Sequence, residues 1–191
     1  MKLAIIQGSI RKNRETPKQA LWVLNAAKEL KGVTAEIVDL KDYPLPLFDE
    51  GISPRYNPNR VIDPAVKPWL DKLAGFDAYV WVTPEYNHSI PGALKNAIDY
   101  LTFEMNRKPA AVVSHGAMGG ARAATDLKEI LSESKAAIIP NFVAIPYMSN
   151  LIDEKGVLNA EAAANPYGPQ AALKTLLTEL QWFSDALAAA R

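Results

Sequence analysis

Short apolar runs alternate with amphipathic stretches along most of the chain. Five of these runs are typical of buried parallel strands, at residues 3–7, 33–39, 78–83, 109–114 and 137–145. Between and after them, apolar residues recur at helical spacing and predict helices over residues 16–30, 64–74, 91–101, 121–133 and 170–189. Five strands alternating with helices predict one α/β domain, residues 1–191, with a parallel sheet that helices cover on both faces.

Right-handed crossovers between such strands produce a doubly wound sheet, with either the flavodoxin-like or the Rossmann strand order. In both orders, ligands bind beyond the carboxyl ends of the strands. Three loops follow the first, third and fourth predicted strands, at residues 8–16, 84–90 and 114–120. The pattern therefore predicts that these three loops converge on one ligand site.

Composition and charge narrow the range of partners. The 191 residues include 21 Lys and Arg against 21 Asp and Glu, so the formal net charge is zero. Nucleic acids and anionic membranes attract proteins with a basic excess, so we expect neither as a partner. No apolar run approaches a membrane span, and the apolar start of the chain is too short for a signal peptide. We therefore expect a cytoplasmic protein.

The chain has no cysteine and only two histidines, His88 and His115. Disulfides, thiol nucleophiles and cysteine-ligated metals are thereby excluded, and a histidine-rich metal site is not expected. Redox chemistry on this chain would need an organic cofactor, because no side chain cycles electrons easily.

The first loop joins a strand to the start of a helix, where free N–H groups and the helix dipole favour an anion. Ser9 and Thr16 add hydroxyl groups, and Arg11 and Arg14 are suited to phosphate oxygens. The loop lacks the glycine patterns of dinucleotide-binding folds and of NTPases, which favours a monophosphate such as that of FMN. The alternative is a solvated basic loop.

The other two loops suit a flat ligand. The second carries Tyr86, on which a conjugated ring would stack, among several backbone amides, although a proline-stiffened turn with a surface tyrosine is the alternative. The third, residues 114–120, is glycine-rich and permits close backbone approach to a ligand. Its His115 is either a proton donor near that ligand or hydrogen-bonded scaffolding. A hydrolase is disfavoured, because the chain has no Gly-x-Ser-x-Gly nucleophile elbow.

These segments resemble the NAD(P)H-dependent FMN reductases of the flavodoxin-like superfamily. Residues 8–11 match the family's Gly-Ser-x-Arg, and residues 84–99 match its Pro-Glu-Tyr-Asn-x-Ser-x-Pro-Gly-x-Leu-Lys-Asn-Ala-Ile-Asp. The glycine-rich turn at 116–120 and the helix that carries Arg122 resemble a third family motif, and the similarity covers roughly residues 2–145. One departure is Glu15, whose carboxylate would repel a phosphate unless it points away.

The resemblance implies a flavodoxin-like sheet of order 2-1-3-4-5, bound FMN, and a homodimer or homotetramer. It places Ser9, Arg11, Arg14 and Thr16 at the phosphate. It places Pro84, Glu85, Tyr86 and Asn87 against the isoalloxazine ring, and Ser114, His115 and Gly116 at the pyrimidine edge of that ring.

The resulting hypothesis is an enzyme that moves two electrons from NADPH or NADH, through FMN, to a small acceptor. Quinones, free flavin, azo compounds and metal oxyanions are the acceptor classes, and no side chain is assigned a catalytic role. The alternatives are a non-enzymatic FMN electron carrier and a redox-sensing FMN-binding protein. True flavodoxins are usually strongly acidic, so the neutral charge favours the enzyme.

A proline- and tyrosine-rich stretch at residues 43–59 is too long for a simple connection. Its apolar side chains are Tyr43, Leu45, Leu47, Phe48 and Tyr56. They predict self-association of the chain, and packing of the stretch on its own core is the alternative.

Overall fold

A parallel sheet forms the centre of the computed structural model, which describes all residues 1–191. Its strands lie in the order β2-β1-β3-β4-β5, and a further strand, β6, also pairs with β4. The strands are β1 (Lys2–Gln7), β2 (Thr34–Asp39), β3 (Ala78–Pro84), β4 (Pro109–Gly116), β5 (Ala137–Ile138) and β6 (Val143–Pro146). The predicted flavodoxin-like doubly wound sheet is confirmed, and every strand pair is parallel.

The fifth predicted strand is wrong in one respect, because residues 137–145 do not form a continuous strand. They form β5 and β6, which pair with the start and the end of β4 respectively. Pro140 lies between the two pieces, and a proline has no N–H to donate to a sheet ladder. The edge of the sheet is interrupted there.

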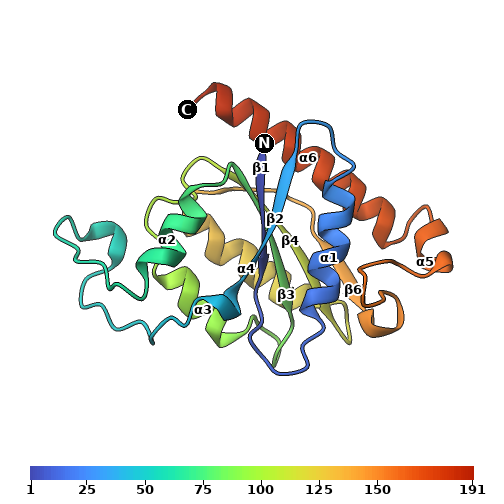
Figure 1. Cartoon of the computed structure of the whole chain (residues 1–191), viewed down its shortest axis with the longest axis horizontal. Coiled ribbons are helices and arrows are strands. Elements are labelled where there is room, and N and C mark those ends of the chain that lie inside the picture. Colours follow the sequence, from blue (N-terminus) through green and yellow to red (C-terminus); the bar gives the residue numbers. More distant parts are fainter.

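Helices cover both faces of the sheet, as Figure 1 shows with the sheet seen nearly edge-on. They are α1 (Thr16–Ala27), α2 (Lys67–Ala74), α3 (Gly92–Asp99), α4 (Ala121–Glu133), α5 (Ala160–Ala164) and α6 (Pro169–Ala189). Helix α2 begins three residues later than the pattern predicts, and the short α5 is not predicted at all. None of the helices combines the length and apolarity needed to cross a membrane.

Two apolar layers result from the alternation of side chains along the strands. Ile6, Trp81 and Val112 belong to the core between the sheet and α2, α3 and α4. Their neighbours in sequence, such as Ile5 and Val113, belong to the core on the side of α1 and α6. Both faces of β3 are therefore buried, which is why it reads as an unbroken apolar run.

Most apolar side chains of residues 43–59, the stretch after β2, pack against the core of the domain. It begins with the 3-10 turn η1 (Leu40–Asp42), and a second, η2 (Pro54–Tyr56), lies further along. Tyr43, Leu45 and Phe48 pack against the core on the α2–α3–α4 side, whereas Leu47 and Tyr56 are exposed. Three of the five apolar side chains thus pack on the core of the domain, which is the alternative to self-association given above.

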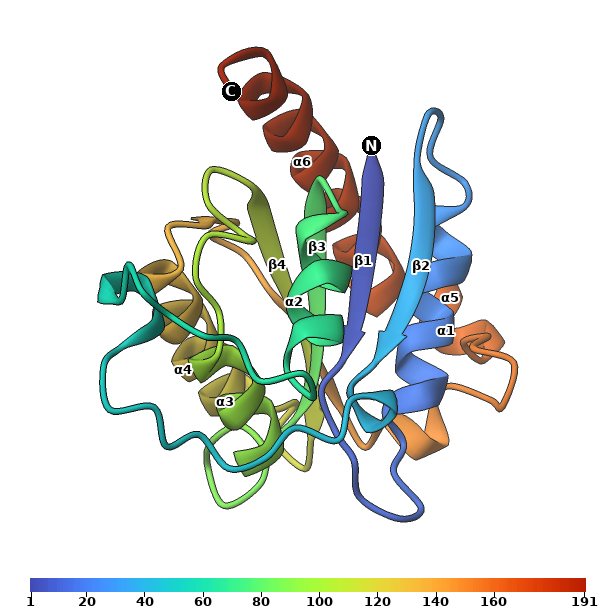
Figure 2. The ribbon, with the colours of Figure 1, turned by 60° about the vertical axis from the view of Figure 1, so that its left-hand side comes forward.

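The carboxyl ends of β1, β3 and β4 lie side by side at one edge of the sheet. Gln7 pairs with Val82 of β3, and Pro84 of β3 pairs with His115 of β4. The loops that leave these strands meet at the lower edge of the molecule in Figure 2. The fold thus brings the three predicted loops together.

Candidate functional site

The β1–α1 loop begins at Ser9, which is fully buried. The Ser9 hydroxyl accepts a hydrogen bond from the N–H of Arg11 at 3.3 Å and lies 2.9 Å from the hydroxyl of Tyr86. The Arg11 guanidinium is exposed and lies 5.4 Å from the centre of the Tyr86 ring. Arg11 has no ion-pair partner, so its charge is available to a ligand.

The remainder of this loop has backbone N–H groups that are suited to an anion. The N–H groups of residues 12–16 have no acceptor within the protein, and they precede the positive end of α1. Thr16 is fully buried, and its hydroxyl oxygen also lacks a hydrogen-bond partner. Because a buried hydroxyl without a partner is costly, an acceptor such as a phosphate oxygen fits this position.

Arg14 and Glu15 are engaged within the protein. Both terminal nitrogens of Arg14 pair with the carboxylate of Asp39 at the end of β2, and one of them also donates to the Ser9 carbonyl. Glu15 pairs with Lys18 at 2.9 Å, and Lys18 also pairs with Glu154 at 2.8 Å, so the carboxylate of Glu15 is engaged by a cation of α1. The departure from the family motif is therefore tolerated, and Arg14 holds the loop against β2.

The β3–α3 loop contains a tight turn. The N–H groups of Tyr86 and Ser89 each donate to the other residue's carbonyl, at 2.9 and 3.1 Å. The two residues between them, Asn87 and His88, have positive φ values of 49° and 71°, as in the turns of tight hairpins. This turn holds the Tyr86 side chain beside Ser9.

Glu85 ties the β3–α3 loop to the start of α4. Its carboxylate accepts from the N–H of Arg122 at 3.1 Å and lies 3.3 Å from the Arg122 guanidinium. A carboxylate at this position satisfies free N–H groups and complements the helix dipole. Glu85 therefore fixes one loop of the site relative to another.

The turn of the β4–α4 loop requires glycine. Gly120, with φ of 77°, lies so close to the backbone that a Cβ atom there would be 2.7 Å from the His115 carbonyl oxygen. The buried Ser114 hydroxyl donates to the Gly119 carbonyl at 2.9 Å, which holds the turn. The His115 ring is bonded to Gln19 of α1, with 2.6 Å between His115 Nδ1 and Gln19 Oε1.

The predicted site residues thus converge, but they differ in what they offer a ligand. Arg11 is exposed without an ion-pair partner, Thr16 has a buried hydroxyl without a partner, and the side chains of Tyr86 and His115 are partly exposed. Arg14, Glu85 and Ser114 are bonded within the protein and hold the loops. Gln19 and Asp39 also belong to the site, and no motif in the sequence distinguishes them from ordinary helix and strand residues. Arg122 lies on the helix of the third family motif, and its contact with Glu85 was not predicted.

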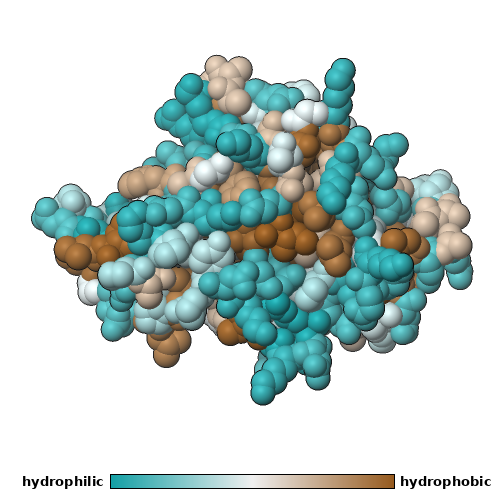
Figure 3. All heavy atoms as spheres, viewed as in Figure 1, coloured by the Kyte–Doolittle hydropathy of each residue, from teal (hydrophilic) through white to brown (hydrophobic).

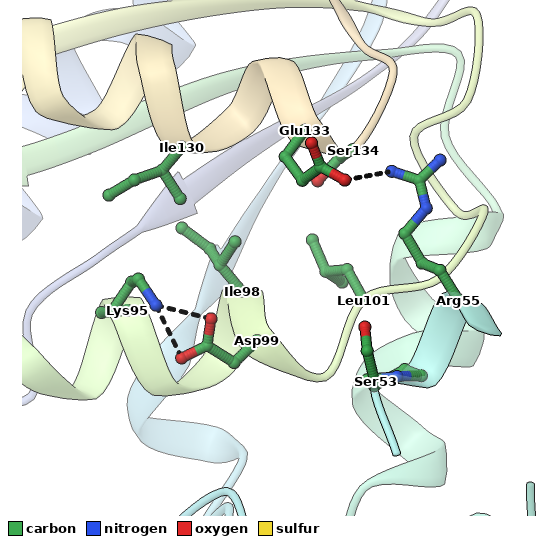
Figure 4. A pocket seen from close by; sticks show the side chains of 10 residues that line it. Ser53, Arg55, Lys95, Ile98, Asp99, Leu101, Ile130, Glu133 and Ser134 are labelled. Atoms are coloured by element: carbon green, nitrogen blue, oxygen red, sulfur yellow. Dashed lines mark hydrogen bonds and ion pairs between the residues drawn. The ribbon is translucent and has the colours of Figure 1, made fainter. Parts of the chain in front are cut away.

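A cavity of about 300 Å³ lies elsewhere, near the carboxyl end of α4 (Figure 4). The charged groups that line it pair with one another: Lys95 with Asp99 at 2.6 Å, and Arg55 with Glu133 at 3.9 Å. Because α4 begins at the three loops and ends here, this cavity is separate from the candidate site.

The sheet order and the three loops that converge at its carboxyl edge define a flavodoxin-like α/β protein. The family model described as NADPH-dependent FMN reductase matches residues 1–149, and the chain belongs to this family. It is an oxidoreductase that uses FMN and NAD(P)H.

Individual relatives agree with this assignment. An NAD(P)H-dependent FMN reductase of Schizosaccharomyces pombe is 38% identical over 144 residues, which are 75% of this chain and 72% of the relative. A quinone reductase of Pseudomonas putida is 39% identical over 127 residues, 62% of each chain. The flavoenzyme NAD(P)H:(acceptor) oxidoreductase FerB from Paracoccus denitrificans has a TM-score of 0.69 at 25% identity, with 98% of this chain and 97% of FerB covered.

Proposed function

We propose that this protein passes two electrons from NADPH or NADH, through FMN held by the three loops, to a small-molecule acceptor. The observation that carries the proposal is the set of free N–H groups at residues 12–16, with the unpartnered hydroxyl of Thr16, in a loop whose Ser9 and Arg11 contact Tyr86. Together they suit a phosphate and an adjoining flat ring. Bound FMN supplies the hydride-accepting chemistry, and the chain supplies orientation and hydrogen bonds.

The roles of the residues follow from their contacts. Ser9, Arg11 and Thr16 would bind the phosphate. Pro84, Tyr86 and Asn87 would lie against the isoalloxazine ring, and His115 and Gly116 would meet its pyrimidine edge. Arg14, Glu85 and Ser114 would act by holding the loops in place.

Quinones are the acceptor class with the most direct support, since several relatives are quinone reductases or quinone oxidoreductases. Free flavin, azo compounds and metal oxyanions are further acceptor classes of this proposal. We also propose a cytoplasmic location for this enzyme.

The decisive experiment is the oxidation of NADPH or NADH by the purified FMN-loaded protein, with and without a quinone. The enzyme should oxidise at least one nicotinamide cofactor at a rate that the quinone increases. Anaerobic mixing with each nicotinamide alone should bleach the yellow colour. A protein that binds FMN but stays yellow with both would instead be an electron carrier or a redox sensor.

A further inference from the structure

Gln19 is a fully buried amide that belongs to none of the three loops. It lies near the start of α1, and its side chain bridges two neighbouring residues of β4. The amide nitrogen, Nε2, donates to the carbonyl of Ser114 at 3.0 Å. The amide oxygen, Oε1, lies 2.6 Å from Nδ1 of His115.

These two contacts determine which His115 nitrogen carries hydrogen. The Ser114 carbonyl can only accept, so the amide nitrogen of Gln19 must face it and the amide oxygen must face the imidazole. The reversed amide would place two acceptor oxygens together. Because an amide oxygen is only an acceptor, Nδ1 of His115 must carry the hydrogen in this bond.

The other nitrogen, Nε2, is then the unprotonated one. No protein atom bonds it, and it does not belong to the buried polar atoms that lack a partner, so it reaches the surface of the site. Burial lowers the pKa of the imidazole from 6.5 to about 4. The charge of Arg11 also lowers this pKa, and the charge of Glu15 raises it. At neutral pH the ring is therefore uncharged.

We propose that Gln19 is a positioning residue that fixes His115 as the Nδ1–H tautomer, so that His115 accepts a hydrogen bond from the bound flavin. The inference rests on the proposed FMN site. It excludes His115 as the proton donor of the reaction, because the nitrogen that faces the ligand has no proton to give.

The chemistry of the ligand limits what His115 can bind. The imide N–H is the only ring N–H of oxidised FMN, and the other polar ring atoms are acceptors. The ribityl chain offers hydroxyl groups, which also donate. His115 therefore binds either the imide N–H or a ribityl hydroxyl, and its acceptor nitrogen cannot serve the ring's carbonyl oxygens.

The tautomer can be measured in the protein without FMN. Nitrogen-15 NMR of the histidine side chains should show His115 as the Nδ1–H form between pH 6 and 8. Replacing Gln19 with leucine, of similar volume, should release this preference, with His88 as the internal reference. An Nε2–H tautomer in the wild type, or an unchanged tautomer in Gln19→Leu, would overturn the assignment.

Binding of flavin analogues tests the contact itself. If the partner is the imide, 3-methyl-FMN should bind the wild type roughly two- to tenfold more weakly than FMN, the range expected for one neutral hydrogen bond. If the partner is a ribityl hydroxyl, a deoxyribityl analogue should show that loss instead. Gln19→Leu releases the tautomer of His115, so it should reduce the discrimination between FMN and the analogue.

The outcomes separate this inference from the proposed function. Wild-type protein that binds FMN and both analogues equally well would overturn the role of His115 and leave the reductase proposal standing. Wild-type protein that binds no FMN would overturn both, whatever tautomer is found.

Discussion

The Ser9 hydroxyl lies 2.9 Å from the Tyr86 hydroxyl, although 77 positions separate the two residues along the chain. This bond joins the loop that would bind the phosphate to the turn that would lie against the flavin ring. Arg11 lies over the same tyrosine ring, so one side chain organises both parts of the site.

Replacing Tyr86 with phenylalanine removes this bond but keeps the ring. We expect FMN binding to weaken roughly two- to tenfold and the free energy of unfolding to fall by at most about 1.5 kcal/mol, as for one neutral hydrogen bond. Flavin titration and urea unfolding measure the two effects. Ser9→Ala combined with Tyr86→Phe should cost less than the sum of the single changes, and additive losses would show that the residues do not act as a pair. Tyr167→Phe, at a 96% exposed site, is the control.

Arg11→Ala should weaken FMN binding without destabilising the fold. Loss of one or more charge-assisted hydrogen bonds corresponds to roughly ten- to a few-hundred-fold in dissociation constant. Titration of the FMN-free protein measures this affinity, and Lys12→Ala is the control with a smaller expected effect. An unchanged affinity for Arg11→Ala would remove Arg11 from the site.

Arg14→Ala should act differently, although Arg14 is only three residues further along. Its guanidinium pairs with Asp39, and the two side chains are 12% and 23% exposed. Removing it leaves Asp39 partly buried without its partner, so we expect a loss of about 1–3 kcal/mol in the free energy of unfolding. The same change in an Asp39→Asn background should cost less. Equal costs in both backgrounds would contradict a structural role for this pair.

The stability of the FMN-free protein should fall between pH 6.5 and pH 4. Burial lowers the pKa of folded His115 to about 4, whereas the unfolded imidazole titrates near 6.5, so the unfolded state takes up a proton first as the pH falls. The neutral His115 contributes roughly 3 kcal/mol to the free energy of unfolding above pH 6.5, and this contribution is lost by pH 4. Urea unfolding at several pH values should show a shallower dependence in His115→Gln than in the wild type. His88→Asn, on the exposed turn, should retain the wild-type dependence, and identical curves for all three proteins would refute the assignment.

Turnover should follow ping-pong kinetics. The chain carries no second phosphate-binding motif for the nicotinamide dinucleotide, so the nicotinamide and a flat acceptor would compete for the same open face. The donor must then leave before the acceptor binds. Double-reciprocal plots at several fixed acceptor concentrations should be parallel. Intersecting lines would indicate separate donor and acceptor sites.

Self-association remains a prediction, and it now rests on the exposed side chains of the 43–59 stretch together with Val61, which lies just after that stretch. Leu47, Tyr56 and Val61 are 84%, 74% and 92% exposed. They lie on the segment between η1 and α2, at the left of Figure 1, and hydrophobic side chains are visible at that end of the molecule in Figure 3. Light scattering should give the mass of two or four chains for the wild type and a lower mass for Val61→Asp. A wild-type mass near 20.9 kDa would rule out the idea.

The sequence by itself determined the fold class. Fully buried parallel strands must be apolar on both faces, and the helices that cover them must be apolar on one face. It also determined the three loops, since the carboxyl ends of parallel strands necessarily meet at one edge. The break at Pro140 was predictable from the chemistry of proline, yet the apolar residues on both sides of it obscured it.

Only the tertiary structure decided what each site residue is free to do. Arg11 and Arg14 carry the same charge in the same loop, and the sequence could not show that Asp39, 25 positions away, occupies one of them. In the same way, His115 gains its tautomer from Gln19 across 96 positions of sequence. Hydrogen bonds and ion pairs act over a few ångströms in space, so their partners follow from the packing of α1 against the sheet rather than from any local pattern.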